Sequence, residues 1–407
     1  MVKICFYCHV HQPWRVKKYN FFDIGEDPHY WDNEKNEHIA KRASRKCYIP
    51  TNKVLKRLIE AYPDTFHVNF SITGTAIDQL ERYAPEALQS FKELAETGNV
   101  EFVGETYYHS LAYLEDKEEF NRQVRMQEKK LQETFGQTPR VFRNTELILN
   151  NEISHHVKNL GYNAILGEGA DRILNGKSPN HVYKSTYGDE IPLLLRNYNF
   201  SDDIAFRFSN KGWKHYPLHA DKFASWINNV NGSGELVNLF MDYETFGEHQ
   251  WEESGIFEFL EQTIHHLLQH PDNEFVTVSD AAKLPIRGEV DIHSYTSWAD
   301  AERNLDAWVG NDLQRQAHKE AYKFIKHLDT EEQKEIWRRL TTSDHVYYMY
   351  TKGMSDGDVH QHFSPYDSPY KAYMYYLNVL NDLAHRIAKK DQKITERPTQ
   401  LLHKVKS

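Results

Sequence analysis

Short apolar runs alternate with longer segments of helical periodicity over the first 285 residues of the chain. Runs rich in β-branched and aromatic residues predict strands at 3–8, 66–72, 99–104, 140–145, 163–168, 191–197 and 235–242, and a last or edge strand at 275–280. Apolar spacings of three and four predict helices at 51–64, 75–98, 117–135 and 151–160. Strands that alternate with helices are typical of parallel β/α units, and seven or eight units favour a closed barrel over an open sheet.

The pattern changes after about residue 290, where helical periodicity continues at 299–328, 329–341 and 368–390 without a clear strand between the helices. We therefore expect an α/β fold with a β/α barrel at 1–285 and a helical domain at 286–390 that completes the active-site cleft. The polar segment 391–407 is expected to be a frayed tail.

Composition narrows the class of protein. The chain has 49 basic and 59 acidic side chains, a formal charge of −10, which argues against a general nucleic-acid binder. No run of 18 apolar residues is present, so we expect no membrane span, and the N-terminal residues 1–10 are interpreted as a strand and not as a signal peptide. Cys5 and Cys8 would point to opposite faces of that strand, so we expect reduced structural thiols and a cytoplasmic protein.

Polar side chains cluster where the predicted strands end. They are His9 and His11 after the first strand, Glu105 and His109 after the third, Glu146 after the fourth, Glu168 after the fifth, and Asp242 with Glu244 after the seventh. The carboxyl ends of the strands build the active site of a β/α barrel. We therefore expect carboxylates and imidazoles to converge on one face.

Two of these segments suggest acid–base chemistry. In the segment 141–149, an apolar strand runs into Glu146, whose carboxylate Arg143 and Asn144 could orient. In the segment 238–251, a buried strand runs into Asp242, where desolvation is expected to raise the pKa and suit a general acid. Two carboxylates at the ends of different strands, in an aromatic setting, are the minimal requirement for glycoside hydrolysis.

The HVHQPW segment at 9–14 is compatible with two interpretations. His9 and His11 could form half of a metal site, as in metal-dependent sugar deacetylases and zinc mannosidases, or neutral imidazoles could bind sugar hydroxyls without metal. The helical region adds candidate residues near helix ends, which we interpret as a lid. These are Trp298, Trp308, Asp344 and His345.

Five ordered regions of the chain resemble glycoside hydrolase family 57. They are the HQP tripeptide at 11–13, the segment 98–114, FRNTE at 142–146, MDYETFGEHQW at 241–251 and, more loosely, the segment 296–311. The resemblance implies an incomplete, seven-stranded β/α barrel followed by a helical bundle, retaining chemistry on α-glucosidic bonds, and no required metal or cofactor. It identifies Glu146 as the nucleophile and Asp242 as the acid/base.

The resulting hypothesis is an α-amylase-like enzyme acting on α-glucans or maltooligosaccharides. The substrate-binding candidates are His9, His11, Gln12, Glu105, His109, Arg143, Glu244, Trp251, Trp298, Trp308, Asp344 and His345. The alternatives are a 4-α-glucanotransferase using the same residues, a metal-dependent carbohydrate deacetylase or mannosidase, and a non-catalytic glucan-binding protein. We expect no nucleic-acid or membrane partner.

Overall fold

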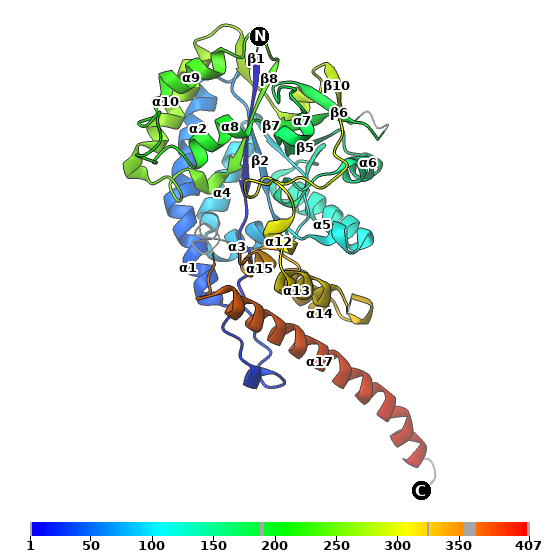
Figure 1. The fold of residues 1–407 in the computed structure, drawn as a ribbon. Helices are drawn as coiled ribbons and strands as arrows, with labels where there is room; N and C mark the ends of the chain where they lie inside the picture. Colours follow the sequence, from blue (N-terminus) through cyan, green and yellow to red (C-terminus); the bar gives the residue numbers. More distant parts are fainter. Residues whose placement is uncertain (1, 188–190, 324, 353–363, 405–407) are drawn as a thin grey trace. The chain divides into compact units, whose positions relative to one another are not determined.

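The computed structural model describes residues 2–187, 191–323, 325–352 and 364–404 (Figure 1). The strands in this part of the chain are β1 (Val2–Val10), β2 (Val68–Ile72), β3 (Val100–Phe102), β4 (Val141–Arg143), β5 (Ala164–Glu168), β6 (Val182–Ser185), β7 (Leu193–Arg196), β8 (Leu236–Asp242), β9 (Asn273–Phe275) and β10 (Ile286–Val290). They form two five-stranded sheets. The first has the order β3-β2-β1-β8 with β9 also paired to β1, and the second has the order β10-β6-β7-β5-β4.

Helices separate most of the strands, as the alternating pattern predicts. They are α1 (Asn33–Ala43), α2 (Ile49–Ala61), α3 (Gly74–Tyr83), α4 (Pro85–Glu96), α5 (Lys117–Phe135), α6 (Asn151–Asn159), α7 (Asp171–Leu174), α8 (Tyr198–Ala205), α9 (Ala220–Asn228), α10 (Ile256–Leu268) and α11 (Val278–Ala281). Helices α12 (Asp306–Val309), α13 (Asp312–Tyr322), α14 (Glu331–Leu340), α15 (Ser343–Tyr347) and α17 (Pro369–Lys404) follow. Helix α10 packs against both α9 and α2 (Figure 1).

Short helical turns complete the list. They are η1 (Phe21–Asp23), the π-helical η2 (Ser44–Tyr48), η3 (Ala112–Leu114), η4 (Thr145–Leu147), η5 (Tyr243–Thr245), η6 (Glu252–Ser254) and η7 (Ile325–His327). Two of these turns directly follow strands, η4 after β4 and η5 after β8.

Strand β1 is buried on both faces, as expected for a central parallel strand. Phe6 and Cys8 belong to a core shared with the covering helices, whereas Cys5 and Tyr7 belong to a second core that draws residues from both sheets. The prediction that Cys5 and Cys8 face opposite ways is therefore confirmed, and both thiols are buried outside any disulfide.

The two sheets approach each other at both ends. A parallel bridge joins Gly104, just after β3, to Phe142 in β4. Near β7 and β8, the Asn238 side chain donates to the Leu195 carbonyl and the Arg196 guanidinium donates to the Phe240 carbonyl. The α/β class with parallel sheets and many helices is confirmed, while a closed seven-stranded barrel and a C-terminal bundle stay predictions.

Several predicted elements differ from the structure. The helix predicted at 75–98 is two helices, because Pro85 lacks an amide proton and forces Ala84 out of helical geometry, with φ −150° and ψ 60°. The strand predicted at 275–280 ends at Phe275, and the Thr277 side chain then caps α11. The helix predicted at 299–328 begins only at Asp306 and is interrupted before Asn311, which caps α13.

The strands β6 and β10 were missed. Strand β10 is mostly exposed and its sequence, IRGEV, has no apolar alternation. Strand β6 pairs antiparallel to β7 through a single residue pair, so the second sheet is mixed and not purely parallel. Helix α17 extends to Lys404 through most of the predicted tail, whose last residues, 405–407, lie outside the described residues.

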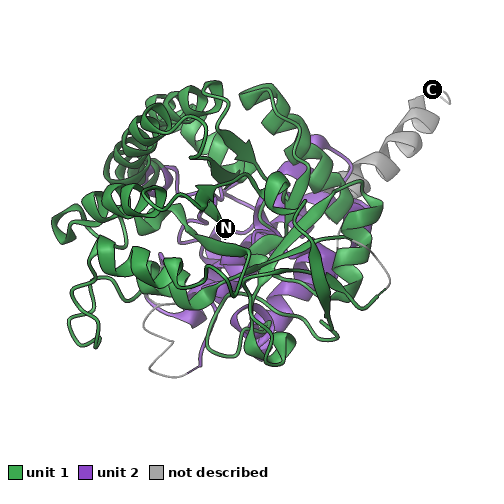
Figure 2. Ribbon diagram, turned by 90° about the horizontal axis from the view of Figure 1, so that it is seen from above, with its two compact units in different colours: residues 1–12, 37–109, 120–305 green, residues 13–36, 110–119, 306–407 purple. Residues whose placement is uncertain are grey.

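The chain divides into two compact units (Figure 2). The first contains residues 1–12, 37–109 and 120–305, and the second contains residues 13–36, 110–119 and 306–407. Within the second unit, Arg338 on α14 forms a buried ion pair with Glu119, and Tyr30 donates a hydrogen bond to Asp382 on α17. These contacts explain why two early loops join the C-terminal helices, which sequence order alone does not indicate. No helix in the described ranges is both long and apolar enough to cross a membrane.

Candidate active site

The carboxyl ends of the parallel strands bring the candidate residues together in the first unit. In the β1 ladders, His9 lies opposite Ser71 of β2 on one side and Asp242 of β8 on the other. Glu105 follows β3, and Glu146 lies in η4, directly after β4. Because the strands run in the same direction, their polar ends meet at one edge.

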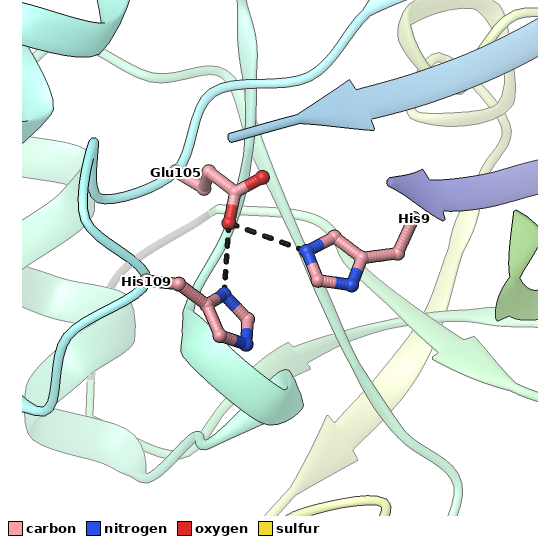
Figure 3. Close-up of side chains that lie close together, drawn as sticks. All are labelled: His9, Glu105 and His109. Carbon is pink, nitrogen blue, oxygen red and sulfur yellow. Dashed lines mark hydrogen bonds and ion pairs between the residues drawn. The ribbon is translucent and has the colours of Figure 1, made fainter. Parts of the chain in front are cut away.

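Glu105 is the centre of this group and is fully buried. Its Oε2 lies 3.2 Å from Nδ1 of His109 and 3.5 Å from Nε2 of His9 (Figure 3), while Ser71 donates a hydrogen bond to Oε1. Arg143 lies 3.8 Å from Oε2. Burial alone would raise the pKa of Glu105, but the His9, His109 and Arg143 side chains outweigh it and hold the pKa well below its usual range.

His109 connects Glu105 to Glu146. Its Nε2 lies 3.0 Å from Oε1 of Glu146. Burial lowers the pKa of His109, but the hydrogen bonds to Glu105 and Glu146 raise it more, to about 9. The imidazole is therefore protonated at neutral pH and donates from both nitrogens, which fixes its orientation between two carboxylates.

Glu146 has a hydrogen-bond donor on each carboxylate oxygen. Trp298 Nε1 donates to Oε2 at 2.7 Å, opposite the His109 contact on Oε1. The Trp298 backbone amide also donates to the Glu146 carbonyl, and the Arg143 guanidinium lies 4.8 Å from the centre of the Trp298 ring. Glu146 has a φ of 57°, a left-handed conformation that is strained for a residue with a Cβ. These contacts hold the carboxylate of Glu146, whose backbone is strained, in one orientation.

Asp242 is held by His9, whose Nδ1 lies 3.3 Å from its Oδ1. The sequence-based expectation of a raised pKa for Asp242 is wrong for this structure. Burial raises the pKa, but His9, His249 and Arg143 outweigh burial and lower it. The Asp242 side chain keeps 46% of its surface exposed.

The raised pKa belongs instead to Glu244, two residues further on. Burial and the charge of Asp242 raise the pKa of Glu244 to about 8, so its carboxyl is neutral at pH 7. Tyr48 and Gln12 both donate to Oε1. These two donors hold the neutral carboxyl group in one orientation.

The remaining candidates in this unit fall into two groups. Glu105, His109 and Arg143 are fully buried and contact other protein groups, so the structure gives them a role in holding other side chains and not a sugar-binding surface. His11 is partly exposed and its Nδ1 lies 3.0 Å from the Thr73 hydroxyl, while the Trp251 side chain is 64% exposed. His11 and Trp251 stay predicted sugar contacts.

Three candidates lie in the second unit. Trp308 is only 1% exposed and packs near Tyr347, which leaves no ring surface for a sugar. His345 is buried, with its Nε2 3.0 Å from the Arg339 carbonyl. Asp344 lies in the first turn of α15. For Trp308 and His345, the aromatic and charged pattern reflects packing around helices and not the predicted ligand surface.

Sequence reasoning missed two supporting residues. Ser71, which hydrogen-bonds Glu105, follows the same rule as the other site residues, because it is a polar residue near the end of β2. Tyr48, which hydrogen-bonds Glu244, comes from η2, far from any strand end, and no local pattern marks it.

A second buried group lies beside Trp298. Glu168, at the end of β5, accepts a hydrogen bond from Arg196 at 3.1 Å, and Arg196 also pairs with Asp202 at 2.5 Å. Burial raises the pKa of Glu168 to about 7 despite the arginine. The Arg196 guanidinium lies 5.9 Å from the Trp298 ring centre, so Trp298 is flanked by two arginines.

The metal interpretation can be compared with these contacts. His9, Glu105 and His109 each place one potential ligand atom within 4.8 Å of the other two, whereas His11 is not in this group. The Arg143 guanidinium, 3.8 Å from Oε2 of Glu105, already supplies positive charge to this cluster. The charges present therefore favour an ion-paired cluster over a cation site.

Comparisons with known proteins agree with this geometry. The family description "Glycosyl hydrolase family 57" matches residues 5–293. A protein of Methanocaldococcus jannaschii named "Putative alpha-amylase" is 43% identical over 404 residues, covering 94% of this chain and 84% of that protein. "Alpha-amylase 1" of Dictyoglomus thermophilum is 25% identical, over 74% of this chain and 42% of its own length.

Solved structures show the same fold at low identity. The 4-alpha-glucanotransferase from Thermococcus litoralis has a TM-score of 0.67 at 15% identity and covers 93% of this chain and 59% of its own. A branching enzyme from Thermococcus kodakaraensis has a TM-score of 0.64 at 15% identity, over 95% of this chain and 90% of its own. The family match and the 43% identical relative together show that the chain belongs to glycosyl hydrolase family 57.

Proposed function

We propose that this protein is a retaining glycoside hydrolase of the α-amylase type that cleaves α-glucosidic linkages in α-glucans. The observation that carries the proposal is an unbroken chain of carboxylates and imidazoles, Glu146–His109–Glu105–His9–Asp242, with spacings of 3.0, 3.2, 3.5 and 3.3 Å. Its two ends, Glu146 and Asp242, have 19% and 46% of their side chains accessible, whereas Glu105 between them is fully buried.

In the first step of the proposed reaction, a Glu146 oxygen attacks the anomeric carbon while Asp242 protonates the glycosidic oxygen, so the carbon–oxygen bond breaks and a glycosyl-enzyme forms. In the second step, Asp242 takes a proton from water, whose oxygen attacks the anomeric carbon and releases Glu146. This chemistry requires Glu146 ionised and Asp242 protonated at the start. The separation of the two carboxyl groups in a retaining enzyme is about 5–5.5 Å.

The supporting residues have separate tasks in this proposal. His109 and Trp298 orient the nucleophile Glu146. Glu105 contacts the imidazoles of both His109 and His9, and in this way it fixes the position of Glu146 relative to Asp242. The neutral Glu244 donates to a sugar hydroxyl beside the scissile bond. An acceptor sugar in place of water would give transfer, as in a 4-α-glucanotransferase, with the same residues.

The test is product analysis with maltooligosaccharides and soluble starch, for the wild-type chain and Glu146→Gln. We expect shorter products from the wild type and almost no turnover from Glu146→Gln, with an unchanged melting temperature. Longer products beside the shorter ones would identify glucan transfer. Substantial activity of Glu146→Gln would exclude Glu146 as the nucleophile, and absence of any product from the wild type would favour a glucan-binding protein.

The cluster of His9, Glu105 and His109 justifies testing a second candidate, a metal-dependent carbohydrate enzyme. Metal analysis of the purified protein, and the same product assay with a chelator, separate the two. One tightly bound zinc per chain with loss of activity on chelation would favour the metal enzyme. Chelator-insensitive turnover would support the two-carboxylate reaction.

A further inference from the structure

An open surface cavity of about 340 Å³ lies in the first unit, in the segment between β7 and β8. Its lining is a group of aromatic, charged and amide side chains, which are Asn199, Asp203, Arg207, Trp213, Lys214, His215 and Trp226. None of these belongs to the carboxylate–imidazole chain of the candidate active site. From this cavity we infer a second carbohydrate-binding site, which takes a neutral α-glucan chain. The choice of α-glucan rests on the proposed function.

The aromatic walls form a corner. The rings of Trp213 and Trp226 have centroids 6.2 Å apart and planes inclined by 82°, and the His215 ring lies 5.2 and 5.0 Å from them. Both indoles are partly exposed. The C–H face of a pyranose packs on an aromatic ring, and consecutive glucose units of an α-1,4-linked chain are inclined to one another. An angled pair of indoles therefore suits a bent glucan better than a flat ligand.

The polar residues that line the cavity suit a ligand that both donates and accepts hydrogen bonds. Asp203, with 12% of its side chain exposed, accepts from Arg207 Nε at 2.6 Å through Oδ1. Lys214 and Arg207 are donors, Asp203 is an acceptor, and the Asn199 amide is both. Sugar hydroxyls can use all of these groups. A phosphate could use only the donors, and the carboxylate of Asp203 would repel it.

Neighbouring side chains of α8 show how the fold separates this cavity from the site. Asp202 pairs with Arg196, which lies beside Trp298, whereas the next residue, Asp203, lines the cavity. Consecutive helical residues point in different directions, so one helix presents one carboxylate to the buried arginine and the other to the cavity. Occupation of the cavity therefore needs no change in the candidate catalytic residues.

The test compares two substrates and two variants. Trp213→Ala removes one wall, and Asn199→Arg obstructs the cavity from an exposed helix position without removing buried packing. We expect glycogen in a native gel to retard each variant less than the wild type, corresponding to an apparent affinity for glycogen about fivefold lower. A fivefold change is roughly the contribution of one aromatic contact. Turnover of maltotetraose should stay unchanged. Phe22→Ala, at an aromatic residue that is 87% exposed, is the matched control and should keep full retardation.

The outcomes separate this site from the proposed activity. A protein without activity on α-glucans that is still retarded by glycogen through Trp213 would reject the proposed activity and support the site. Normal retardation of both variants in an active protein would overturn the site. Quenching of tryptophan fluorescence by inorganic phosphate but not by maltoheptaose, lost in Lys214→Ala, would also overturn it and identify an anion site.

Discussion

Glu146 receives one hydrogen bond on each carboxylate oxygen, from His109 and from Trp298. Two fixed donors remove the rotational freedom of a carboxylate whose backbone is already strained. The sequence analysis placed Trp298 among the substrate-binding candidates, because a tryptophan in a polar segment has no local feature that distinguishes sugar binding from a positioning role. The indole N–H now gives it a positioning role.

Trp298→Phe should keep an aromatic ring between the two arginines while removing the N–H donor together with the pyrrole part of the indole. We expect kcat on maltooligosaccharides to fall about 10- to 100-fold, the value of one hydrogen bond to a charged group, with KM nearly unchanged. Phe22→Leu, at an exposed aromatic residue that the candidate site does not include, is the control. A raised KM with normal kcat in Trp298→Phe would instead support sugar stacking.

His9 lowers the pKa of Asp242, which must be protonated in the first step of the proposed reaction. A lowered pKa places the alkaline limb of the kcat/KM profile at acidic pH, because activity is lost as Asp242 ionises. His9→Gln removes this effect, so the limb should move to higher pH. The measurement is kcat/KM from pH 3 to 9 with His67→Gln as a control. An unmoved limb would show that His9 does not control Asp242.

The loop after β8 positions two acidic residues, Asp242 and Glu244. Asp242 ends β8, Glu244 lies in η5, and the Gly247 amide donates to the Gln250 carbonyl at 2.8 Å to close the loop. Gly247 has a φ of +102°, and an added Cβ would lie 2.0 Å from the Lys46 carbonyl oxygen. The GEHQ sequence therefore folds this way only with glycine at its start.

Gly247→Ala should both unfold more easily and lose activity, because the backbone of the loop must move away from Lys46. We expect the free energy of unfolding to fall by about 2–4 kcal/mol. Gly98→Ala is the matched control, since Gly98 has a φ of +82° but nothing within 4 Å of an added Cβ. It should lose only about 1 kcal/mol from backbone strain. Equal losses in urea unfolding would contradict the steric explanation.

Elements were predicted well where burial sets the local pattern. The strands from β1 to β5, with β7 and β8, are apolar and buried, so composition marks them. The edge strand β10 was missed because it is mostly exposed and carries no such pattern. Helix boundaries depended on single residues, and Pro85 and Asn311 divided segments whose periodicity is continuous.

Burial raises the pKa of several groups across the first unit. Glu168 and Glu244 have pKa values of about 7 and 8, and His109, raised by its carboxylate partners, of about 9. Each of these groups binds its proton more tightly in the folded chain than in the unfolded chain. Their contribution to stability is complete below the unfolded pKa and is lost as pH rises through the folded value. We therefore expect the contribution of these groups to decline as pH rises from about 4.5, the unfolded pKa of the two glutamates, to about 9, the folded pKa of His109.

Glu168→Gln should make this decline shallower, because the amide has no proton to lose. Between the unfolded pKa near 4.5 and the folded value of about 7, the slope of unfolding free energy against pH should be less negative by about 1.4 kcal/mol per pH unit. Urea unfolding at pH 5, 6, 7 and 8 measures it. Glu253→Gln at an exposed position is the control. An unchanged slope would show that Glu168 ionises normally.

The sequence by itself determined the succession of strands and helices and the set of polar residues at the strand ends, because these depend on local apolar patterning and on parallel connections. Only the tertiary structure decided which polar groups meet. Glu146 and Trp298 are 152 positions apart, and His9 and Asp242 are 233 apart. The protonation of Glu244 and His109 and the lowered pKa of Asp242 follow from those meetings, since burial and charge at a side chain depend on neighbours that distant parts of the chain supply.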